Sequence, residues 1–281
     1  MTPTAAPVGR LLVCATPIGN LDDVTLRVLA ALRAADVVAC EDTRHTRVLL
    51  ERHGIAARTV SLHEHNEAAR ARELVRRIGA GETVALVSDA GMPLVSDPGF
   101  ALVRACIEAG VRVEVLPGAS AATAALVASG LAAERWRFVG FLPRSARELR
   151  ALTDGAAETI VAFESPRRLA RTLALLAQRD PRRALAVCRE LTKLHEEVRR
   201  GAAAELAEHY GENPARGEVT LVLGPCTAGG GEPADGRLQE AAAAVRELVQ
   251  AGARPRRAAA AVAKLTGLRA NELYAELTRG E

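Results

Sequence analysis

Four short apolar runs in the first half of the chain, each separated from the next by an amphipathic stretch, constrain the fold more than any other feature. The runs predict buried strands at residues 11–16, 36–41, 83–88 and 111–116. The stretches between and after them predict helices at residues 26–34, 43–52, 67–78 and 100–109. Near-continuous apolar strands that alternate with helices indicate an α/β fold with a mainly parallel sheet, covered by helices on both faces.

The pattern changes after residue 117. A helix of small residues is predicted at 120–128 and another helix at 166–177. The predicted strands of this part are residues 138–142, 159–164, 184–190 and 217–223. Because these strands alternate less regularly with helices, they indicate a second α/β unit with a more mixed sheet.

The last strand is followed by GPCTAGGGEPADG, a Gly- and Pro-rich stretch with every local signal of a linker. Beyond it, residues 238–250, 255–265 and 269–278 predict three short helices, too small to bury much core alone. The helices around Gly267 have helix-turn-helix lengths, but small helical hairpins are common in scaffolds and we expect no DNA binding. The expected division is a first α/β domain at 1–117, a second at 118–224, a linker at 225–236 and a helical appendage at 237–281.

Composition places the chain among globular proteins. Its 281 residues, 49% of them hydrophobic, suffice for a sizeable core. No apolar run approaches the roughly 18 residues of a membrane span, and the first residues lack the pattern of a signal peptide. We therefore expect a cytoplasmic protein that does not bind membranes. The five widely spaced cysteines form no metal-ligand pattern and predict reduced core residues and no metal, at Cys14, Cys40, Cys106, Cys188 and Cys226.

Basic residues are concentrated in the middle of the chain. Residues 137–200 carry 14 basic and 8 acidic groups, whereas 1–136 carry 14 and 15 and 201–281 carry 9 and 11. This local excess would attract a polyanion such as nucleic acid, although Arg-rich stretches also occur as solvated helix faces.

Four loops follow the predicted strands of the first unit, at the sheet edge where open α/β sheets bind ligands. They read TPIGNLDD, EDTRHT, SDAGMPLVSDPG and LPGAS. None contains the glycine pattern of a dinucleotide or phosphate loop. Asp89, at a strand end, suits a cation or a ribose hydroxyl, whereas Asp97, just before Pro98, is expected to help start the next helix. Ser120 begins a helix whose free amide groups can bind a carboxylate. Together these loops meet the needs of a nucleoside that carries an amino acid.

The motifs TPIGNL, EDTRHT, LHEHNE, LVSDAGMPLVSDPG, LPGAS, FVGFLP, FES and RELTK, in this order and spacing, resemble the ribosomal RNA small subunit methyltransferase I family. This family is a branch of the tetrapyrrole (corrin/porphyrin) methylases, and it methylates the ribose 2′-oxygen of a cytidine in the decoding region of 16S rRNA. The resemblance runs from about Leu11 to Leu223. It implies two tetrapyrrole-methylase-like α/β domains with S-adenosylmethionine in the cleft between them, a homodimer and no metal.

Carried onto this chain, the resemblance implies a cofactor site formed by Pro17, Asp89, Ala90, Gly91, Met92, Ser120, Ala121, Phe163, Leu191 and Thr220. Met92 stands where the family usually has Thr, and Ala119–Ser120 where Pro and Ser or Cys are usual. Both changes keep the backbone role while altering side-chain contacts.

Methyl transfer to a hydroxyl needs a group that removes the hydroxyl proton. The carboxylates weighed for this role are Glu41, Asp42, Glu164 and Glu190. Lys193 is one of only two lysines beside 35 arginines, which suggests a role that arginine cannot fill. The alternative is that it simply pairs with Glu190, three residues earlier. Our hypothesis places Glu164, Glu190 and Lys193 at the catalytic centre.

The RNA is expected to contact polar and basic groups beside the cleft, namely Asp42, Arg44, Arg47, His63, Asn66, Arg144 and Arg167. Arginine contacts to phosphate raise affinity without reading sequence. Aromatic residues make up only 2% of the chain, so base-stacking platforms are scarce and recognition is expected to rely on the shape of the assembled 30S subunit. Two alternatives stay open: a corrin-precursor methyltransferase of the same fold, and a non-catalytic RNA-binding protein.

Overall fold

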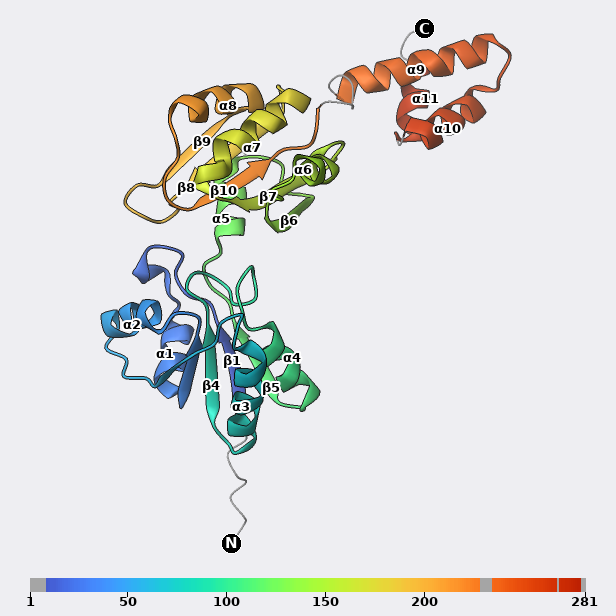
Figure 1. The fold of residues 1–281 in the computed structure, drawn as a ribbon. Helices are drawn as coiled ribbons and strands as arrows, with labels where there is room; N and C mark the ends of the chain where they lie inside the picture. The colour runs from blue at the N-terminus through green and yellow to red at the C-terminus, as the bar shows by residue number, and fades with distance from the viewer. Residues whose placement is uncertain (1–8, 228–233, 267, 279–281) are drawn as a thin grey trace.

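The computed structural model describes residues 9–227, 234–266 and 268–278. It contains two five-stranded sheets, one above the other in Figure 1, and a group of helices at the C-terminal end. The chain enters the first sheet at the end remote from the second, so the carboxyl ends of its parallel strands face the second sheet (Figure 1).

The first sheet is wholly parallel, as predicted. Its order is β3-β2-β4-β1-β5, and its strands are β1 (Arg10–Cys14), β2 (Val37–Cys40), β3 (Thr59–Ser61), β4 (Thr83–Val87) and β5 (Arg112–Leu116). Alternate strand residues point to opposite faces. One face packs on α1 (Leu26–Ala34) and α2 (Thr43–Arg52), the other on α3 (Glu67–Gly79) and α4 (Phe100–Glu108).

The second sheet is mixed, also as predicted. Its order is β6-β7-β10-β8-β9, and only the β6–β7 pair is parallel. The strands are β6 (Trp136–Phe141), β7 (Thr159–Glu164), β8 (Ala184–Arg189), β9 (Glu197–Ala202) and β10 (Val219–Leu223). The helix α5 (Ala121–Ser129) packs on one face. The opposite face is covered by α6 (Ala146–Thr153), α7 (Pro166–Arg179) and α8 (Ala203–Glu212).

Two strands and two α-helices of the described chain were not predicted, namely β3, β9, α6 and α8. The edge strand β9 reads EVRRGA and none of its residues is buried, so it lacks the apolar pattern of the inner strands. The three residues of β3 are only half-buried. The helices α6 and α8 bury only two and three residues.

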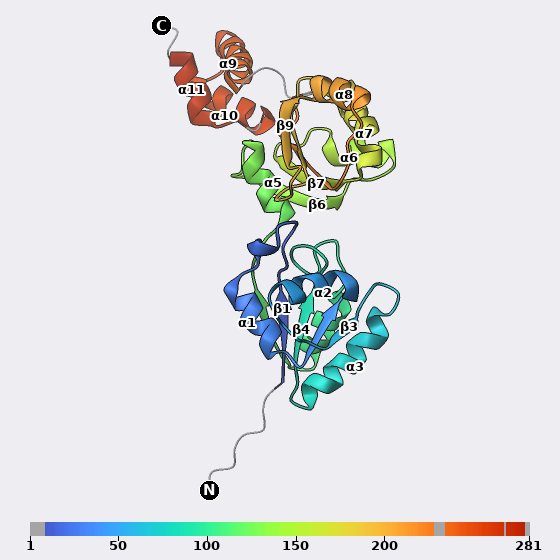
Figure 2. The ribbon, with the colours of Figure 1, turned by 90° about the vertical axis from the view of Figure 1, so that its left-hand side faces the viewer.

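The C-terminal helices α9 (Ala234–Gln250), α10 (Pro255–Thr266) and α11 (Ala270–Thr278) pack on one another (Figure 2). They share a small buried cluster that includes Val245, Val262 and Leu273. The helix α9 begins four residues before the predicted start, inside the predicted linker. Residues 228–233 of that linker and the predicted turn residue Gly267 lie outside the described residues. No helix in the described ranges is long and apolar enough to cross a membrane.

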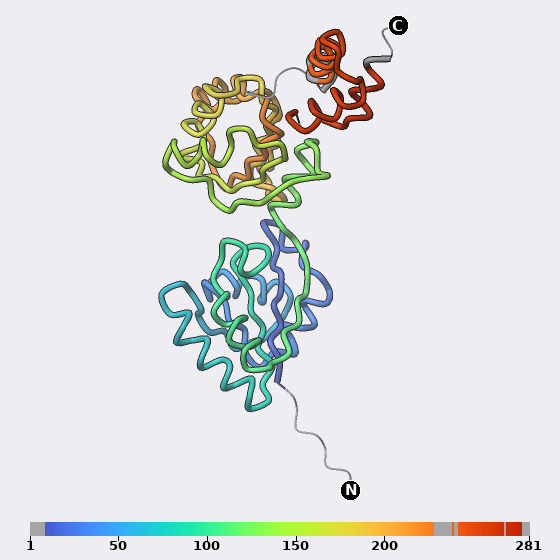
Figure 3. The backbone as a smooth tube through the Cα atoms, turned by 90° about the vertical axis from the view of Figure 1, so that its right-hand side faces the viewer, coloured from blue at the N-terminus to red at the C-terminus, as the bar shows by residue number. Residues whose placement is uncertain are grey.

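The cysteines of both sheets are buried in the core, as predicted, with Cys226 half-buried. Burial raises the pKa of the Cys14 thiol to about 12, as expected for an inert core side chain. Figure 3 follows the chain from β5 across to α5, the covalent connection between the two units.

Candidate cofactor and substrate site

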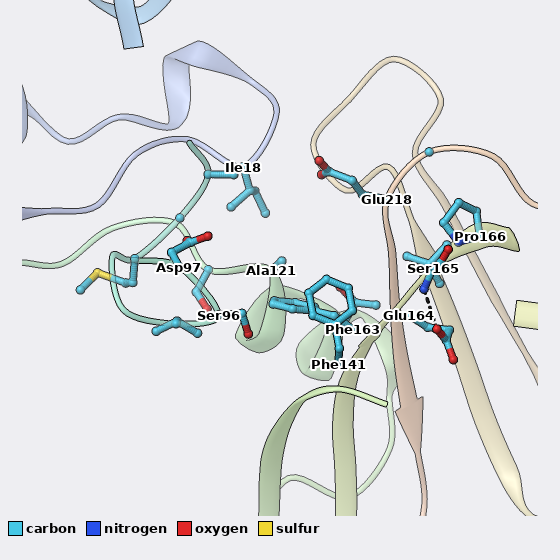
Figure 4. A pocket seen from close by; sticks show the side chains of 18 residues that line it. Ile18, Ser96, Asp97, Ala121, Phe141, Phe163, Glu164, Ser165, Pro166 and Glu218 are labelled. Carbon is cyan, nitrogen blue, oxygen red and sulfur yellow. Dashed lines mark hydrogen bonds between the residues drawn. The ribbon is translucent and has the colours of Figure 1, made fainter. Parts of the chain in front are cut away.

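A cavity of about 420 Å³ lies between the two units (Figure 4). Its wall is built from the loops that follow β1 and β4, the start of α5, the ends of β6 and β7, and the turn into β10. The volume is in the range of sites for small organic ligands. The cavity therefore lies at the carboxyl edge of the parallel sheet, where the sequence predicts ligand-binding loops.

Seven of the ten predicted cofactor residues line this cavity: Ala90, Gly91, Met92, Ser120, Ala121, Phe163 and Thr220. Three others, all within the described part of the chain, are not in its wall. Pro17 precedes Ile18, which does line it. Leu191 packs against the cluster beneath α5. The Asp89 carboxylate contacts the start of α2 instead.

Gly91 joins the first and third loops at the cavity floor. Its backbone N–H donates to the Thr16 carbonyl at 3.1 Å, and the Thr16 N–H donates to the Gly91 carbonyl at 2.8 Å. Its φ of +79° lies in the left-handed region that favours glycine. A Cβ there would touch Ile18 at 3.4 Å and the Ala119 carbonyl at 3.5 Å. This turn therefore needs glycine for its conformation and keeps the floor narrow.

The N-terminus of α5 opens at the cavity wall. Ser120 is its N-cap residue, but in the described chain its hydroxyl accepts no hydrogen bond from the first helical turn. The first N–H groups of a helix lack partners within the helix and attract anions. Because Ser120 and Ala121 both line the cavity, this end offers donors to a carboxylate, as the LPGAS motif predicts.

Asp89 holds the start of α2 rather than the cavity. Its Oδ1 accepts the backbone N–H of Asp42 at 3.1 Å. Its Oδ2 lies 3.6 Å from Nδ1 of His45. The carboxylate that the sequence assigns to the cofactor thus ties the EDTRHT loop to the end of β4.

Asp97 differs from Asp89, because it lies in the cavity wall and does not hold a helix start. The expectation that it helps to start α4 is wrong, because Gly99 is the N-cap and Glu67 Oε1 accepts the N–H groups of Gly99 at 2.9 Å and Ala101 at 2.8 Å. Asp97 instead lines the cavity. Burial, with the negative charges of Glu41 and Asp89, raises its pKa to about 6.

The loop that carries Asp97 has an unusual backbone. Leu94 and Ser96 have φ values of +71° and +67°, in the left-handed region that non-glycine residues rarely adopt. Such conformations persist where the surroundings enforce them, and they concentrate at functional sites. Ser96 and Asp97 both line the cavity, so the strained segment presents its side chains to the site.

Glu164 borders the cavity, but its carboxylate is directed away from it (Figure 4). The side chain has 0% exposure. It accepts the Ser165 N–H at 2.6 Å and the Thr172 hydroxyl at 2.7 Å, and it forms an ion pair with the Arg168 guanidinium at 2.5 Å. These contacts fix the turn from β7 into α7 and point to a positioning role rather than the hypothesised catalytic one.

Lys193 and Glu190 form a network beside the cavity. The Lys193 ammonium donates to Glu190 Oε1 and to Glu218 Oε2, each at 3.0 Å. Partial burial works against the charge of Lys193, but the bonds to Glu218 and Glu190 outweigh it and raise the lysine pKa. An ammonium whose pKa is raised is a poor proton acceptor, so the pairing alternative left open by the sequence fits better than a base.

The RELTK loop also joins the two units. The Asn20 N–H donates to Thr192 Oγ1 at 3.0 Å. A Cβ on Gly19 would lie 2.5 Å from Cγ of Lys193 and 2.7 Å from Thr192 Oγ1. Gly19 is therefore required because this loop packs directly on it, and the contact fixes one side of the cavity.

Four of the predicted RNA contacts are occupied by local bonds. Asp42 caps α2 through the Arg44 N–H at 2.8 Å and pairs with the Arg44 guanidinium at 2.6 Å. These hydrogen bonds lower the Asp42 pKa to about 2. Asn66 binds the His63 N–H at 3.0 Å and its Nε2 at 3.1 Å. By contrast, three exposed arginines have no ion pair with any described residue: Arg47, Arg144 and Arg167.

Sequence reasoning missed part of the cavity wall. The additional lining residues are Ile18, Val95, Ser96, Phe141, Ser165, Pro166, Gly217, Glu218 and Val219, besides Asp97. Ile18, Phe141 and Ser165 belong to motifs quoted for the resemblance, and that membership was the available signal.

Known proteins resemble this chain over most of its length. The sequence profile described as Tetrapyrrole (Corrin/Porphyrin) Methylases matches residues 10–207. The ribosomal RNA small subunit methyltransferase I of Mesorhizobium japonicum is 47% identical over 95% of this chain and 90% of its own. That of Mycobacterium tuberculosis H37Rv is 48% identical, with 95% and 93% covered. The solved uroporphyrin-III C-methyltransferase of Thermus thermophilus is 26% identical and superposes with a TM-score of 0.57 over 77% of this chain and 94% of its own.

Proposed function

The chain belongs to the tetrapyrrole methylase family and, within it, to the ribosomal RNA small subunit methyltransferase I group. We propose that it transfers a methyl group from S-adenosylmethionine to the ribose 2′-oxygen of a cytidine in the decoding region of 16S rRNA. The identity of 47–48% to those relatives over 95% of the chain carries the proposal.

The cavity residues fit this cofactor. The free N–H groups at the start of α5 suit a carboxylate such as that of a methionine moiety. The turn at Gly91, whose positive φ favours glycine, brings the backbone of the third loop to the cavity wall, where it can contact a ligand. S-adenosylmethionine, when bound, supplies an electrophilic methyl group on a sulfonium. The chain itself must hold the hydroxyl in line and accept its proton.

Asp97 is the residue proposed to accept that proton. It lines the cavity and has a side-chain hydrogen bond with Ser88, whereas the carboxylates of Glu164 and Glu190 are each engaged in several hydrogen bonds. With a pKa of about 6, it is ionised at neutral pH and still more basic than an ordinary aspartate. Both properties favour a general base.

The RNA is proposed to lie across the mouth of the cavity on the second unit. Arg144 follows β6 and Arg167 lies in the first turn of α7. Since β6 and β7 are parallel, both arginines lie at the same sheet edge as the cavity residues Phe141 and Phe163. They are free to bind phosphate, whereas Arg44 is engaged by Asp42. The remaining parts of the proposal are a homodimer, a cytoplasmic location and the 30S subunit as substrate.

The proposal predicts that the purified protein methylates 30S particles much faster than naked 16S rRNA. The physical reason is the scarcity of aromatic side chains, which leaves the shape of the subunit to position the RNA. Transfer of labelled methyl groups and mapping of 2′-O-methylation test this. Equal rates on both substrates would contradict recognition of the subunit. Cofactor binding without transfer to either would favour the corrin alternative, and no cofactor binding would favour a non-catalytic protein.

Lys193→Ala is predicted to weaken cofactor binding severalfold without changing the pH dependence of methyl transfer. The substitution removes the cation that holds Glu218, a cavity residue, to Glu190. Calorimetry measures the affinity for S-adenosylmethionine. Single-turnover rates of methyl transfer at several pH values measure the pH dependence. Lys193→Arg, which keeps the charge, is the matched control. A lost pH dependence at unchanged affinity would instead make Lys193 the base.

A further inference from the structure

Strand β6 contains a β-bulge next to the cavity. Phe138 lies opposite Val161 on β7, but Phe141 lies opposite Phe163, so three steps along β6 match two along β7. Gly140, within the bulge, has a φ of +66°. A glycine in this conformation is a standard way to insert one extra residue into a strand.

The bulge decides which way Phe141 points. In a regular ladder Phe141 would lie opposite Glu164 and its side chain would emerge on the other face of the sheet, because strand residues alternate. With the extra residue, Phe141 shares a face with Phe163. Their ring centroids are 5.6 Å apart in an edge-to-face arrangement, and Phe163 stands 4.9 Å from Phe138 in the same manner. Three of the four phenylalanines of the chain thus gather at one wall.

Phe141 is the outermost ring of this group. It lines the cavity and yet remains 60% exposed, whereas Phe163 is only partly exposed behind it. An exposed ring that is held by a second ring and by a bulge has a fixed orientation. Such a ring offers a flat apolar face to a planar ligand, and nucleic-acid-binding proteins stack unpaired bases on faces of this kind.

The ring is also linked to the loop that carries Asp97. A Cβ on Gly140 would lie 3.5 Å from Ser96 Oγ, so the bulge packs beside the residue preceding Asp97. Figure 4 shows Ser96 between Asp97 and the two phenylalanines. The donors suited to a cofactor carboxylate lie instead at the start of α5 and the Gly91 turn. A ligand stacked on Phe141 therefore reaches Asp97 from the exposed side of the cavity.

We propose that Phe141 is the platform on which the base of the target nucleotide, turned out of the RNA, stacks so that its ribose hydroxyl reaches Asp97. This inference rests on the proposed function and specifies how its substrate is held. Enzymes that modify a base turn the nucleotide out of its stack into a pocket, and stacking on side chains there compensates for the lost contacts. The same arrangement would bring the ribose of the target nucleotide into this cavity.

The test compares Phe141→Ala, Phe141→Trp and a matched control, Phe100→Ala. Phe100 is 63% exposed, like Phe141, but does not line the cavity. For Phe141→Ala we expect kcat/KM for 30S subunits to fall about 5- to 100-fold, the range typical of one base–aromatic stack, with cofactor affinity within about twofold. Phe141→Trp keeps a stacking face and should restore most of the activity, and Phe100→Ala should behave as wild type.

The remaining outcomes separate this inference from the function it rests on. Weaker cofactor binding by Phe141→Ala, with an unchanged response to 30S concentration, would overturn the inference and place the cofactor on the ring. Wild-type values for both quantities would overturn it by making Phe141 a passive wall residue. A wild-type protein that methylates no 30S subunits would instead defeat the proposed function, and the inference with it.

Discussion

Asp97→Asn is expected to lower the rate of methyl transfer by about 10²- to 10⁴-fold, the usual contribution of a general base. The substitution keeps the size of a side chain that faces the cavity but removes its ability to accept a proton. Cofactor affinity should change little, because the donors suited to the cofactor carboxylate lie at the start of α5. Single-turnover transfer to 30S subunits and calorimetry with S-adenosylmethionine measure the two effects separately.

The pH dependence provides an independent check. Burial, Glu41 and Asp89 raise the pKa of Asp97 from 3.8 to about 6, so the wild-type rate should fall as the pH drops below about 6. Glu41→Gln removes one of those charges and should move this midpoint to lower pH. In Asp97→Asn the residual rate should lose this dependence. A full rate in Asp97→Asn would assign the proton to another group.

The same shift has a consequence for stability. A carboxyl group whose pKa is higher in the folded chain holds its proton more tightly there, so its stabilising contribution is present at low pH. That contribution is lost as the pH rises from about 4 to about 6. Asp97→Asn should therefore raise Tm more at about pH 8 than at about pH 4. A variant that is more stable but inactive matches the strain expected of a functional site.

The regular elements could be predicted because their burial is periodic. The helices α1 and α2 and the strand β7 have the predicted bounds, since each carries a clear apolar pattern. The edge strand β9 escaped prediction because an edge strand needs no apolar face, and its charged side chains pair across the sheet, as Arg189 does with Glu197 at 2.9 Å.

The loops that form the candidate site could be predicted from the sequence, but the directions of their side chains could not. The motifs located the loops around the cavity, yet the roles of Asp89 and Asp97 were interchanged. The segment that carries Asp97 contains the positive φ values of Leu94 and Ser96, which local propensity disfavours and only the surrounding packing enforces. Phe141 was missed as a site residue for a similar reason, because a one-residue bulge decides its face.

Glu164 gives the second large effect, in stability. Glu164→Ala is expected to lower the free energy of unfolding by about 3 kcal/mol, as when one partner of a buried ion pair is removed. Three donors converge on this carboxylate, from Ser165, Thr172 and Arg168, and its side chain has 0% exposure. Removal leaves the buried Thr172 hydroxyl without its acceptor and the half-buried Arg168 without its ion pair, although Arg168 keeps its bond to the Leu142 carbonyl. Urea unfolding with an unchanged m-value measures the loss.

Glu164→Gln separates the structural role from the catalytic one that the FES motif suggested. The amide keeps the shape but replaces one acceptor oxygen by a donor facing other donors, so we expect a smaller loss of about 1–2 kcal/mol. Thr172→Val removes one of the three bonds without touching the cavity wall and should cost about 1 kcal/mol. If Glu164 only positions the turn into α7, methyl transfer by folded Glu164→Gln should stay within a few fold of wild type. A stable Gln variant that binds cofactor normally but transfers no methyl group would restore Glu164 to the catalytic centre.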